Sequence, residues 1–171
     1  MKMYKLLLFP VIILLATTAC HTSKRAENNK SGLTELYKEL KHELPDAKVI
    51  KLRDSIKVIY PEVALFDFNK DEIKPNALSS FQRFAKVLNK ENQVYFMING
   101  YTDNVGTDEI NNSLSLRRAN NAKALFKKDG IEDARMVVNG YGSANPLVSN
   151  STDEGKQENR RVEFVLYKRC K

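Results

Sequence analysis

Apolar residues recur at helical spacing in three segments of the chain, and turn or cap residues bound each segment. The first two predicted helices carry their apolar faces at Leu33, Leu36, Tyr37, Leu40 and Leu44, and at Leu78, Phe81, Phe84, Ala85 and Leu88. Pro45 ends the first helix, and Pro75 suits the first turn of the second because its missing N–H is unpaired there anyway. The third helix follows the turn TDNVG (102–106) and is closed by Gly130.

Short apolar runs between these helices predict the strands. VIKL (49–52) and IKVIY (56–60) indicate a hairpin, and further strands are expected in EVALFDFNKDEIKPN (62–76), QVYFMINGY (93–101) and ARMVVNGYG (134–142). A long polar loop, SANPLVSNSTDEGKQ (143–157), precedes the last strand, in which Val162, Phe164 and Leu166 alternate with polar positions. Because strands alternate with helices, the sequence predicts an α+β layered fold with helices packed on a mixed sheet.

The N-terminus has the pattern of an export signal. Lys2 and Lys5 precede an apolar run at 6–16 that is too short to span a bilayer, and small residues follow it. The sequence TTAC (17–20) resembles the lipobox of bacterial lipoproteins, although leucine is usual where Thr17 stands. Residues 1–19 are therefore expected to be a lipoprotein signal peptide, and 20–32 a tether lipidated at Cys20. The alternative is ordinary cleavage near Ala19, which leaves Cys20 as a free thiol.

Net charge and cysteine content limit the partners and the means of stabilisation. The chain carries a formal charge of +7, of which the two signal lysines supply two. Basicity alone would suit nucleic acid, but an exported protein does not meet it, so no nucleic-acid partner is expected. Once Cys20 is lipidated, Cys170 is the only free thiol, so no disulfide framework is expected and stability must come from packing.

The chain has few residues suited to catalysis. His21 lies in the tether, His42 lies on the polar side of the first helix, and neither stands in an arrangement with a Ser or Cys nucleophile. Two isolated histidines and one tail cysteine do not make a zinc site. No cofactor is implied and the protein is not expected to be an enzyme, with cell-wall hydrolysis by paired carboxylates as the residual enzymatic alternative.

One acidic stretch resembles a calcium loop without completing it. Asp67, Asn69 and Asp71 match the opening D-x-N-x-D of an EF-hand. That loop needs glycine at its sixth position and glutamate at its twelfth, where this chain has Glu72 and Leu78. No metal site is expected, and turn and capping chemistry accounts for these side chains.

An arginine lies on the apolar stripe of the third predicted helix. At 100° per residue, that stripe contains Asn111, Leu114, Arg118, Ala122 and Leu125. A guanidinium cannot deprotonate to escape burial, so Arg118 needs a carboxylate nearby, and Asp103 is the first candidate. The pair is either a clamp for a ligand or an internal salt bridge that fixes the turn against the helix. Asn111 adds a second polar group to the stripe.

Four ordered segments carry a family resemblance. FDFNKDEIKP (66–75), GYTDNVG (100–106), LSLRRA (114–119) and ENRRVEF (158–164) resemble the OmpA-like peptidoglycan-binding domain of outer-membrane proteins, peptidoglycan-associated lipoproteins and flagellar stator proteins of the MotB type. The resemblance runs from about Val58 to Leu166 and implies a β-α-β-α-β fold in 58–171, with 33–57 as an N-terminal helix and hairpin extension. Tyr101 departs from the family, in which histidine often precedes the TD pair.

The resemblance also implies a ligand and its contacts. In that family the domain grips the diaminopimelate of the peptide stem by its ammonium and carboxylate. Asp103 matches the family's aspartate and Arg118 its arginine, Asn69 and Asn111 would add hydrogen bonds, and Arg160 would help to hold the carboxylate. Arg161 is expected to be structural or on the surface.

The predicted function combines the anchor and the domain. We expect an outer-membrane lipoprotein, facing the periplasm, that binds peptidoglycan without catalysis and tethers membrane to wall. The alternative is an interaction module that positions envelope protein partners, in which wall binding is secondary.

Overall fold

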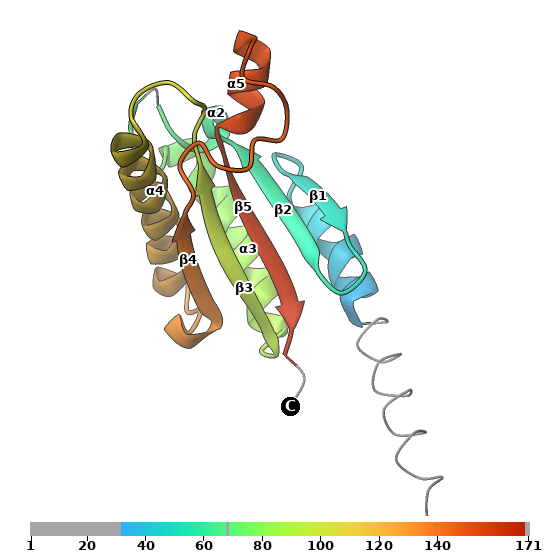
Figure 1. The fold of residues 1–171 in the computed structure, drawn as a ribbon. Coiled ribbons are helices and arrows are strands. Elements are labelled where there is room, and N and C mark those ends of the chain that lie inside the picture. The colour runs from blue at the N-terminus through green and yellow to red at the C-terminus, as the bar shows by residue number, and fades with distance from the viewer. Residues whose placement is uncertain (1–31, 68, 170–171) are drawn as a thin grey trace, which may run out of the picture.

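Five strands form one mixed sheet in a computed structural model that describes residues 32–67 and 69–169 (Figure 1). The strands are β1 (Lys48–Lys51), β2 (Ile56–Pro61), β3 (Val94–Tyr101), β4 (Met136–Gly140) and β5 (Arg161–Lys168). Their order is β1-β2-β5-β3-β4, in which only the β3–β4 pair is parallel. The expected signal peptide, Cys20, Cys170 and the tether as far as 31 lie outside the described residues.

Three longer helices cover one face of this sheet: one at residues 32–43, α3 (Leu78–Lys90) and α4 (Asp108–Lys128) (Figure 1). Two short helices, α2 (Glu62–Leu65) and α5 (Asp153–Asn159), lie at one end of it. The predicted α+β fold, with its β-α-β-α-β order and its helices on a mixed sheet, is confirmed. None of the described helices is both long and apolar enough to cross a bilayer.

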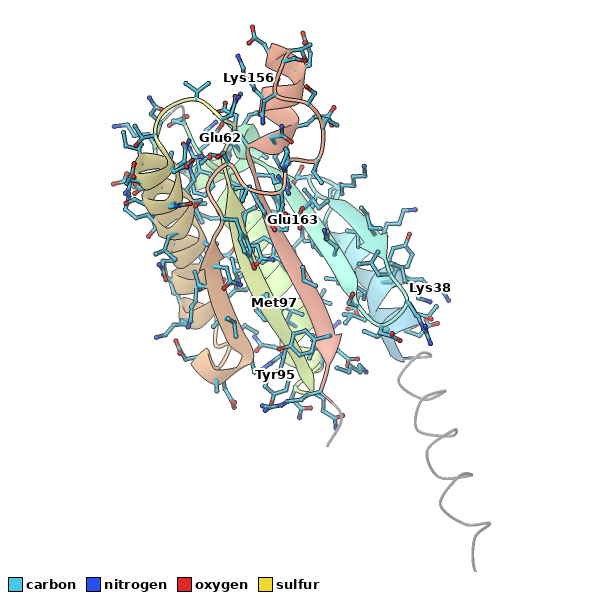
Figure 2. The ribbon with its side chains drawn as sticks, viewed as in Figure 1. Lys38, Glu62, Tyr95, Met97, Lys156 and Glu163 are labelled. Carbon is cyan, nitrogen blue, oxygen red and sulfur yellow. The ribbon has the colours of Figure 1, made fainter. Side chains whose placement is uncertain are left out.

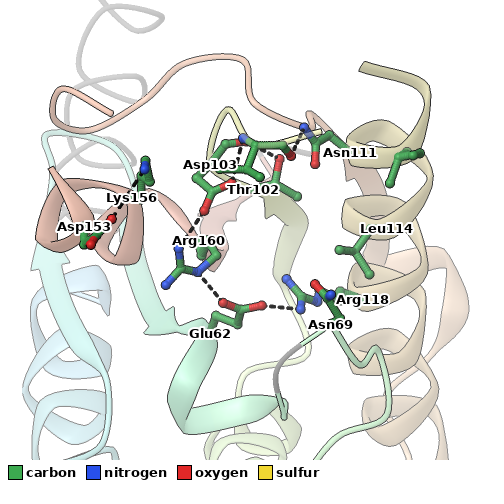
Figure 3. Close-up of a pocket in the computed structure, with 12 residues that line it drawn as sticks. Glu62, Asn69, Thr102, Asp103, Asn111, Leu114, Arg118, Asp153, Lys156 and Arg160 are labelled. Atoms are coloured by element: carbon green, nitrogen blue, oxygen red, sulfur yellow. Dashed lines mark hydrogen bonds and ion pairs between the residues drawn. The ribbon is translucent and has the colours of Figure 1, made fainter. Parts of the chain in front are cut away.

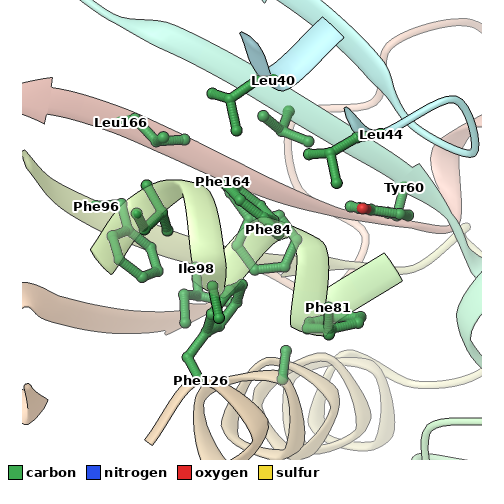
Figure 4. Close-up of a cluster of buried hydrophobic side chains, with 14 of the residues drawn as sticks. Leu40, Leu44, Tyr60, Phe81, Phe84, Phe96, Ile98, Phe126, Phe164 and Leu166 are labelled. Atoms are coloured by element: carbon green, nitrogen blue, oxygen red, sulfur yellow. The ribbon is translucent and has the colours of Figure 1, made fainter. Parts of the chain in front are cut away.

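The core lies between the helices and the sheet and is dominated by aromatic rings (Figure 4). Phe164 of β5 lies at its centre, with ring centroids 5.4 Å from Phe84 of α3 and 5.6 Å from Phe126 of α4. Leu40 and Leu44 from the N-terminal segment belong to the same buried cluster. The boundary expected between residues 57 and 58 falls inside β2, which pairs with β5, so the N-terminal extension shares the sheet and core of the rest.

Two glycines allow α4 to lie directly on β3 and β4. A Cβ on Gly100 would stand 2.1 Å from the carbonyl oxygen of Ser115, and one on Gly140 would stand 2.6 Å from Leu116. Real Cβ atoms do not approach other atoms so closely, so only glycine permits this contact. The close approach brings the N-terminal half of α4 beside the loop that follows β3.

Two predictions about local structure are wrong. The segment expected as a strand from 62 begins as α2, and only the isolated bridge between Phe66 and Ile73 resembles a strand pairing. A four-residue apolar run does not distinguish a buried strand from a helical turn. The expected polar loop contains α5, whose cap Thr152 accepts a hydrogen bond from the backbone N–H of Gly155 at 3.1 Å. Acidic residues follow this cap in the first turn, which is a local helix signal.

Candidate functional site

A pocket of about 330 Å³ opens beside α4, between the loop after β3 and the short helices α2 and α5 (Figure 3). It is lined by Glu62, Asn69, Thr102, Asp103, Val105, Ile110, Asn111, Leu114, Arg118, Asp153, Lys156 and Arg160. The five residues predicted to bind a ligand are all in this set. Glu62 and Lys156 mark the pocket end of the molecule, and Tyr95 at the start of β3 marks the opposite end (Figure 2). The fold therefore brings together side chains from four separate segments.

Arg118 is almost completely buried, and Glu62 is the carboxylate that neutralises it. Its Nη2 donates to Oε1 of Glu62, its Nε donates to the carbonyl oxygen of Lys70 at 3.0 Å, and its guanidinium lies 4.9 Å from the ring centre of Phe66. Burial lowers the pKa of Arg118, and the Glu62 carboxylate opposes that shift. The expectation that Arg118 pairs with Asp103 is wrong, because Glu62 supplies the required negative charge from α2.

Arg160 connects the two carboxylates of the pocket. Its Nε donates to Oε2 of Glu62 at 2.5 Å and its Nη1 donates to Oδ2 of Asp103 at 2.6 Å. Burial by itself lowers the pKa of Arg160, but the hydrogen bonds to Asp103 and Glu62 outweigh it and raise that pKa. The result is a continuous chain of charges in the order Asp103, Arg160, Glu62, Arg118.

The loop after β3 is held in place by the predicted polar residues themselves. Oδ1 of Asp103 accepts from the backbone N–H of Val105 at 2.9 Å, and Nδ2 of Asn111 donates to the carbonyl oxygen of Val105 at 3.1 Å. Thr107 caps α4 by accepting from the N–H of Ile110. Asn69 is exposed at the pocket with a φ of 57°, a conformation that asparagine tolerates better than most residues.

Sequence reasoning missed the residues that α2 and α5 contribute to the pocket. These are Glu62, Asp153 and Lys156, which lie in segments expected to be strand and loop. A signal for Glu62 did exist, because it is the one charged residue in the stretch EVALF.

Arg161, expected to be structural or on the surface, is buried. It pairs with Glu163 at 2.8 Å and lies 3.7 Å from the ring centre of Tyr101.

The charges of the pocket sum to zero, and each of its two guanidiniums has a nitrogen that no described residue engages. Two carboxylates, Glu62 and Asp103, lie among two guanidiniums, Arg118 and Arg160. In the described part of the chain, no residue engages Nη1 of Arg118 or Nη2 of Arg160 by a hydrogen bond or ion pair. Residues 32–67 and 69–169 contain no group of three His, Cys, Asp or Glu side chains placed to hold a metal ion. Such an arrangement suits binding of a group that carries both an anion and a cation.

Comparison with known proteins identifies the family of the chain. The model of the OmpA family matches residues 65–160, more than half of the chain. The chain belongs to the OmpA family. The matched region includes Asn69, Asp103, Asn111, Arg118 and Arg160, whereas Glu62 precedes it.

Relatives of this OmpA-family chain include envelope lipoproteins. It is 35% identical over 118 residues to the probable lipoprotein YiaD of Escherichia coli, covering 69% of this chain and 54% of that one. A putative MotB-like protein of Desulfovibrio vulgaris has a TM-score of 0.79 at 26% identity, over 85% of this chain and 99% of that one. The peptidoglycan-associated lipoprotein of Burkholderia pseudomallei has a TM-score of 0.56 at 26% identity, over 66% of this chain and 89% of that one. The chain spans about half the length of YiaD.

Proposed function

We propose that this protein is an outer-membrane lipoprotein that binds peptidoglycan through the diaminopimelate of the peptide stem and so tethers the outer membrane to the wall. Cys20 would carry the lipid, the domain would face the periplasm, and no catalysis would be involved. The observation that carries the proposal is the neutral pocket in which two guanidiniums and two carboxylates lie side by side.

The free head of diaminopimelate carries one ammonium and one carboxylate, and the pocket has a partner for each. Asp103 would accept from the ammonium, and the unengaged nitrogens of Arg118 and Arg160 would donate to the carboxylate. Asn69 and Asn111 line the same pocket and would hydrogen-bond to the neighbouring polar groups of the stem. The exposed Val105 and Ile110 at the rim would contact the aliphatic part of the stem.

Binding of one stem is expected to be moderate, and attachment to the wall strong. A hydrogen bond to a charged group contributes about 1.5–3 kcal/mol, and the entropy of association offsets several such bonds. Retention follows because the wall repeats its stems and because a lipid anchor on the same chain raises the effective concentration at both ends.

Co-sedimentation with purified sacculi tests the proposal. The full chain in a neutral detergent is compared with Asp103→Asn, Arg118→Met and a control, Asp133→Asn. Asp133 forms ion pairs with Lys123 and Lys127 just before β4, at the other end of that strand from the pocket. We expect the wild type and the control to pellet and both pocket variants to stay in solution, with circular dichroism showing all four folded.

Three results would contradict the proposal. Pelleting of both pocket variants like the wild type would remove its mechanism, and failure of the wild type to pellet would favour the alternative of an envelope interaction module. Release of soluble fragments from the sacculi by the wild type would show hydrolysis instead.

A further inference from the structure

A single buried carboxylate contacts both arginines of the pocket. Oε1 of Glu62 accepts from Arg118 and Oε2 accepts from Arg160, and only 9% of the Glu62 side chain is exposed. Figure 3 shows Glu62 between the two guanidiniums, on the α2 side of the pocket. Both of its oxygens are therefore already engaged before any ligand arrives.

The other acidic residues of the pocket region do not serve this purpose. Asp71 pairs with Arg117, the neighbour of Arg118 on an exposed part of α4, at 2.5 Å. Asp153 is almost fully exposed and reaches only Lys156, at 3.4 Å. Asp103 contacts Arg160 but not Arg118. Glu62 is thus the only described carboxylate that contacts both guanidiniums.

Glu62 also determines the net charge of the pocket. The formal charges of Glu62, Asp103, Arg118 and Arg160 sum to zero. Without Glu62, the other three side chains carry a net charge of one positive unit. An excess positive charge in a partly desolvated site attracts any carboxylate and repels an ammonium. A neutral site with separated charges instead favours a ligand that carries both groups, and selectivity depends on this difference.

We propose that Glu62 makes the pocket selective for a zwitterionic head over a simple carboxylate, by holding Arg118 and Arg160 in place and cancelling one of their two charges. This inference rests on the proposed function, because it concerns the ligand of the same pocket. Glu62 is a positioning residue that acts through the arginines, since its own oxygens are engaged by them.

Three synthetic tripeptides separate the two ligand groups. Each has the sequence L-alanyl-γ-D-glutamyl-X, where X is meso-diaminopimelate (ammonium and carboxylate), 2-aminopimelate (carboxylate alone) or L-lysine (ammonium alone). The dissociation constants are measured by titration calorimetry on the full chain in neutral detergent. We expect the wild type to prefer the diaminopimelate peptide to both of the others.

The Glu62→Gln variant keeps the shape of the side chain and removes its charge. We expect its preference for diaminopimelate over 2-aminopimelate to fall about tenfold, because the added positive charge penalises the ammonium and rewards the carboxylate. A merely structural role for Glu62 would weaken both peptides equally and leave their ratio unchanged. The charge-matched control Asp133→Asn should keep the wild-type ratio, since Asp133 lies away from the pocket.

Charge compensation tests the same idea independently. Arg160→Gln leaves the pocket with one negative charge and should shift the preference towards the lysine peptide. The double variant, Glu62→Gln with Arg160→Gln, is neutral again and should regain most of the wild-type ratio at lower affinity. These two variants decide the question if Glu62→Gln alone does not fold.

The outcomes separate the two claims. If the wild type binds the diaminopimelate peptide but the ratios do not follow the pocket charge, the inference about Glu62 is wrong and the proposed function stands. If the wild type binds none of the three peptides, the proposed function is wrong and the inference fails with it.

Discussion

Removing Glu62 should cost more stability than removing Arg118, although the two form one ion pair. Glu62→Ala leaves Arg118, which is 2% exposed, in ion-pair contact with no carboxylate among the described residues, with only the Lys70 carbonyl and the Phe66 ring as direct partners. Breaking a buried pair from one side costs about 3–5 kcal/mol, because the remaining charge is uncompensated. Arg118→Met leaves Glu62 paired with Arg160 at 2.5 Å, so no buried charge is stranded. Methionine fills much of the space, so we expect a cost of about 1 kcal/mol.

Urea unfolding of the full chain in neutral detergent measures this difference. The chain contains no tryptophan, so far-ultraviolet circular dichroism is the signal. With a urea slope of about 2 kcal/mol per molar, a difference of about 2 kcal/mol between the variants separates their midpoints by about 1 M. If Arg118→Met unfolds at the same or a lower urea concentration than Glu62→Ala, then Arg160 does not stabilise Glu62, and the pairing of Glu62 with both arginines is wrong.

Three further substitutions test the fold around the pocket. Gly100→Ala places a methyl group 2.1 Å from the Ser115 carbonyl oxygen, so α4 must shift. Overpacking of this kind costs at least about 1–3 kcal/mol, and the urea midpoint should fall accordingly. An unchanged midpoint would contradict the close approach of α4 to β3. Thr107→Ala removes the cap of α4 and should cost about 1 kcal/mol in the same assay, whereas no loss would show that the cap contributes nothing. Burial raises the pKa of Tyr60 to about 12, whereas the same hydroxyl in the unfolded chain ionises near the ordinary value of 10, so the free energy of unfolding should fall as pH rises from 10 to 12. The Tyr60→Phe variant should show a shallower fall. An equally steep fall in that variant would exclude Tyr60 as its cause.

The periodic parts of the fold could be predicted, and the short helices could not. Phe81, Phe84 and Leu88 repeat at helical spacing and Val162 and Phe164 alternate, because each pattern records which face is buried. The segment EVAL is too short for either period to appear. In α5 there is no apolar face to detect, because its seven residues are mostly polar and only its cap and acidic first turn indicate a helix.

The residues of the pocket could likewise be predicted only in part. Asp103 and Arg118 could be singled out because each stands in a local motif, and Arg118 interrupts an apolar stripe. The partner of Arg118 could not be identified, because Glu62 lies 56 residues away and Arg160 lies 98 residues from Glu62. Pairings over such separations follow from sheet order and helix placement, which local patterns do not specify.

A crystal structure of the chain with the diaminopimelate tripeptide would show whether this pocket holds the zwitterionic head of diaminopimelate. We expect the ammonium within hydrogen-bond distance of the Asp103 carboxylate, and the carboxylate within hydrogen-bond distance of the guanidiniums of Arg118 and Arg160. A peptide bound elsewhere, or bound here with its ammonium and carboxylate in contact with solvent alone, would contradict it.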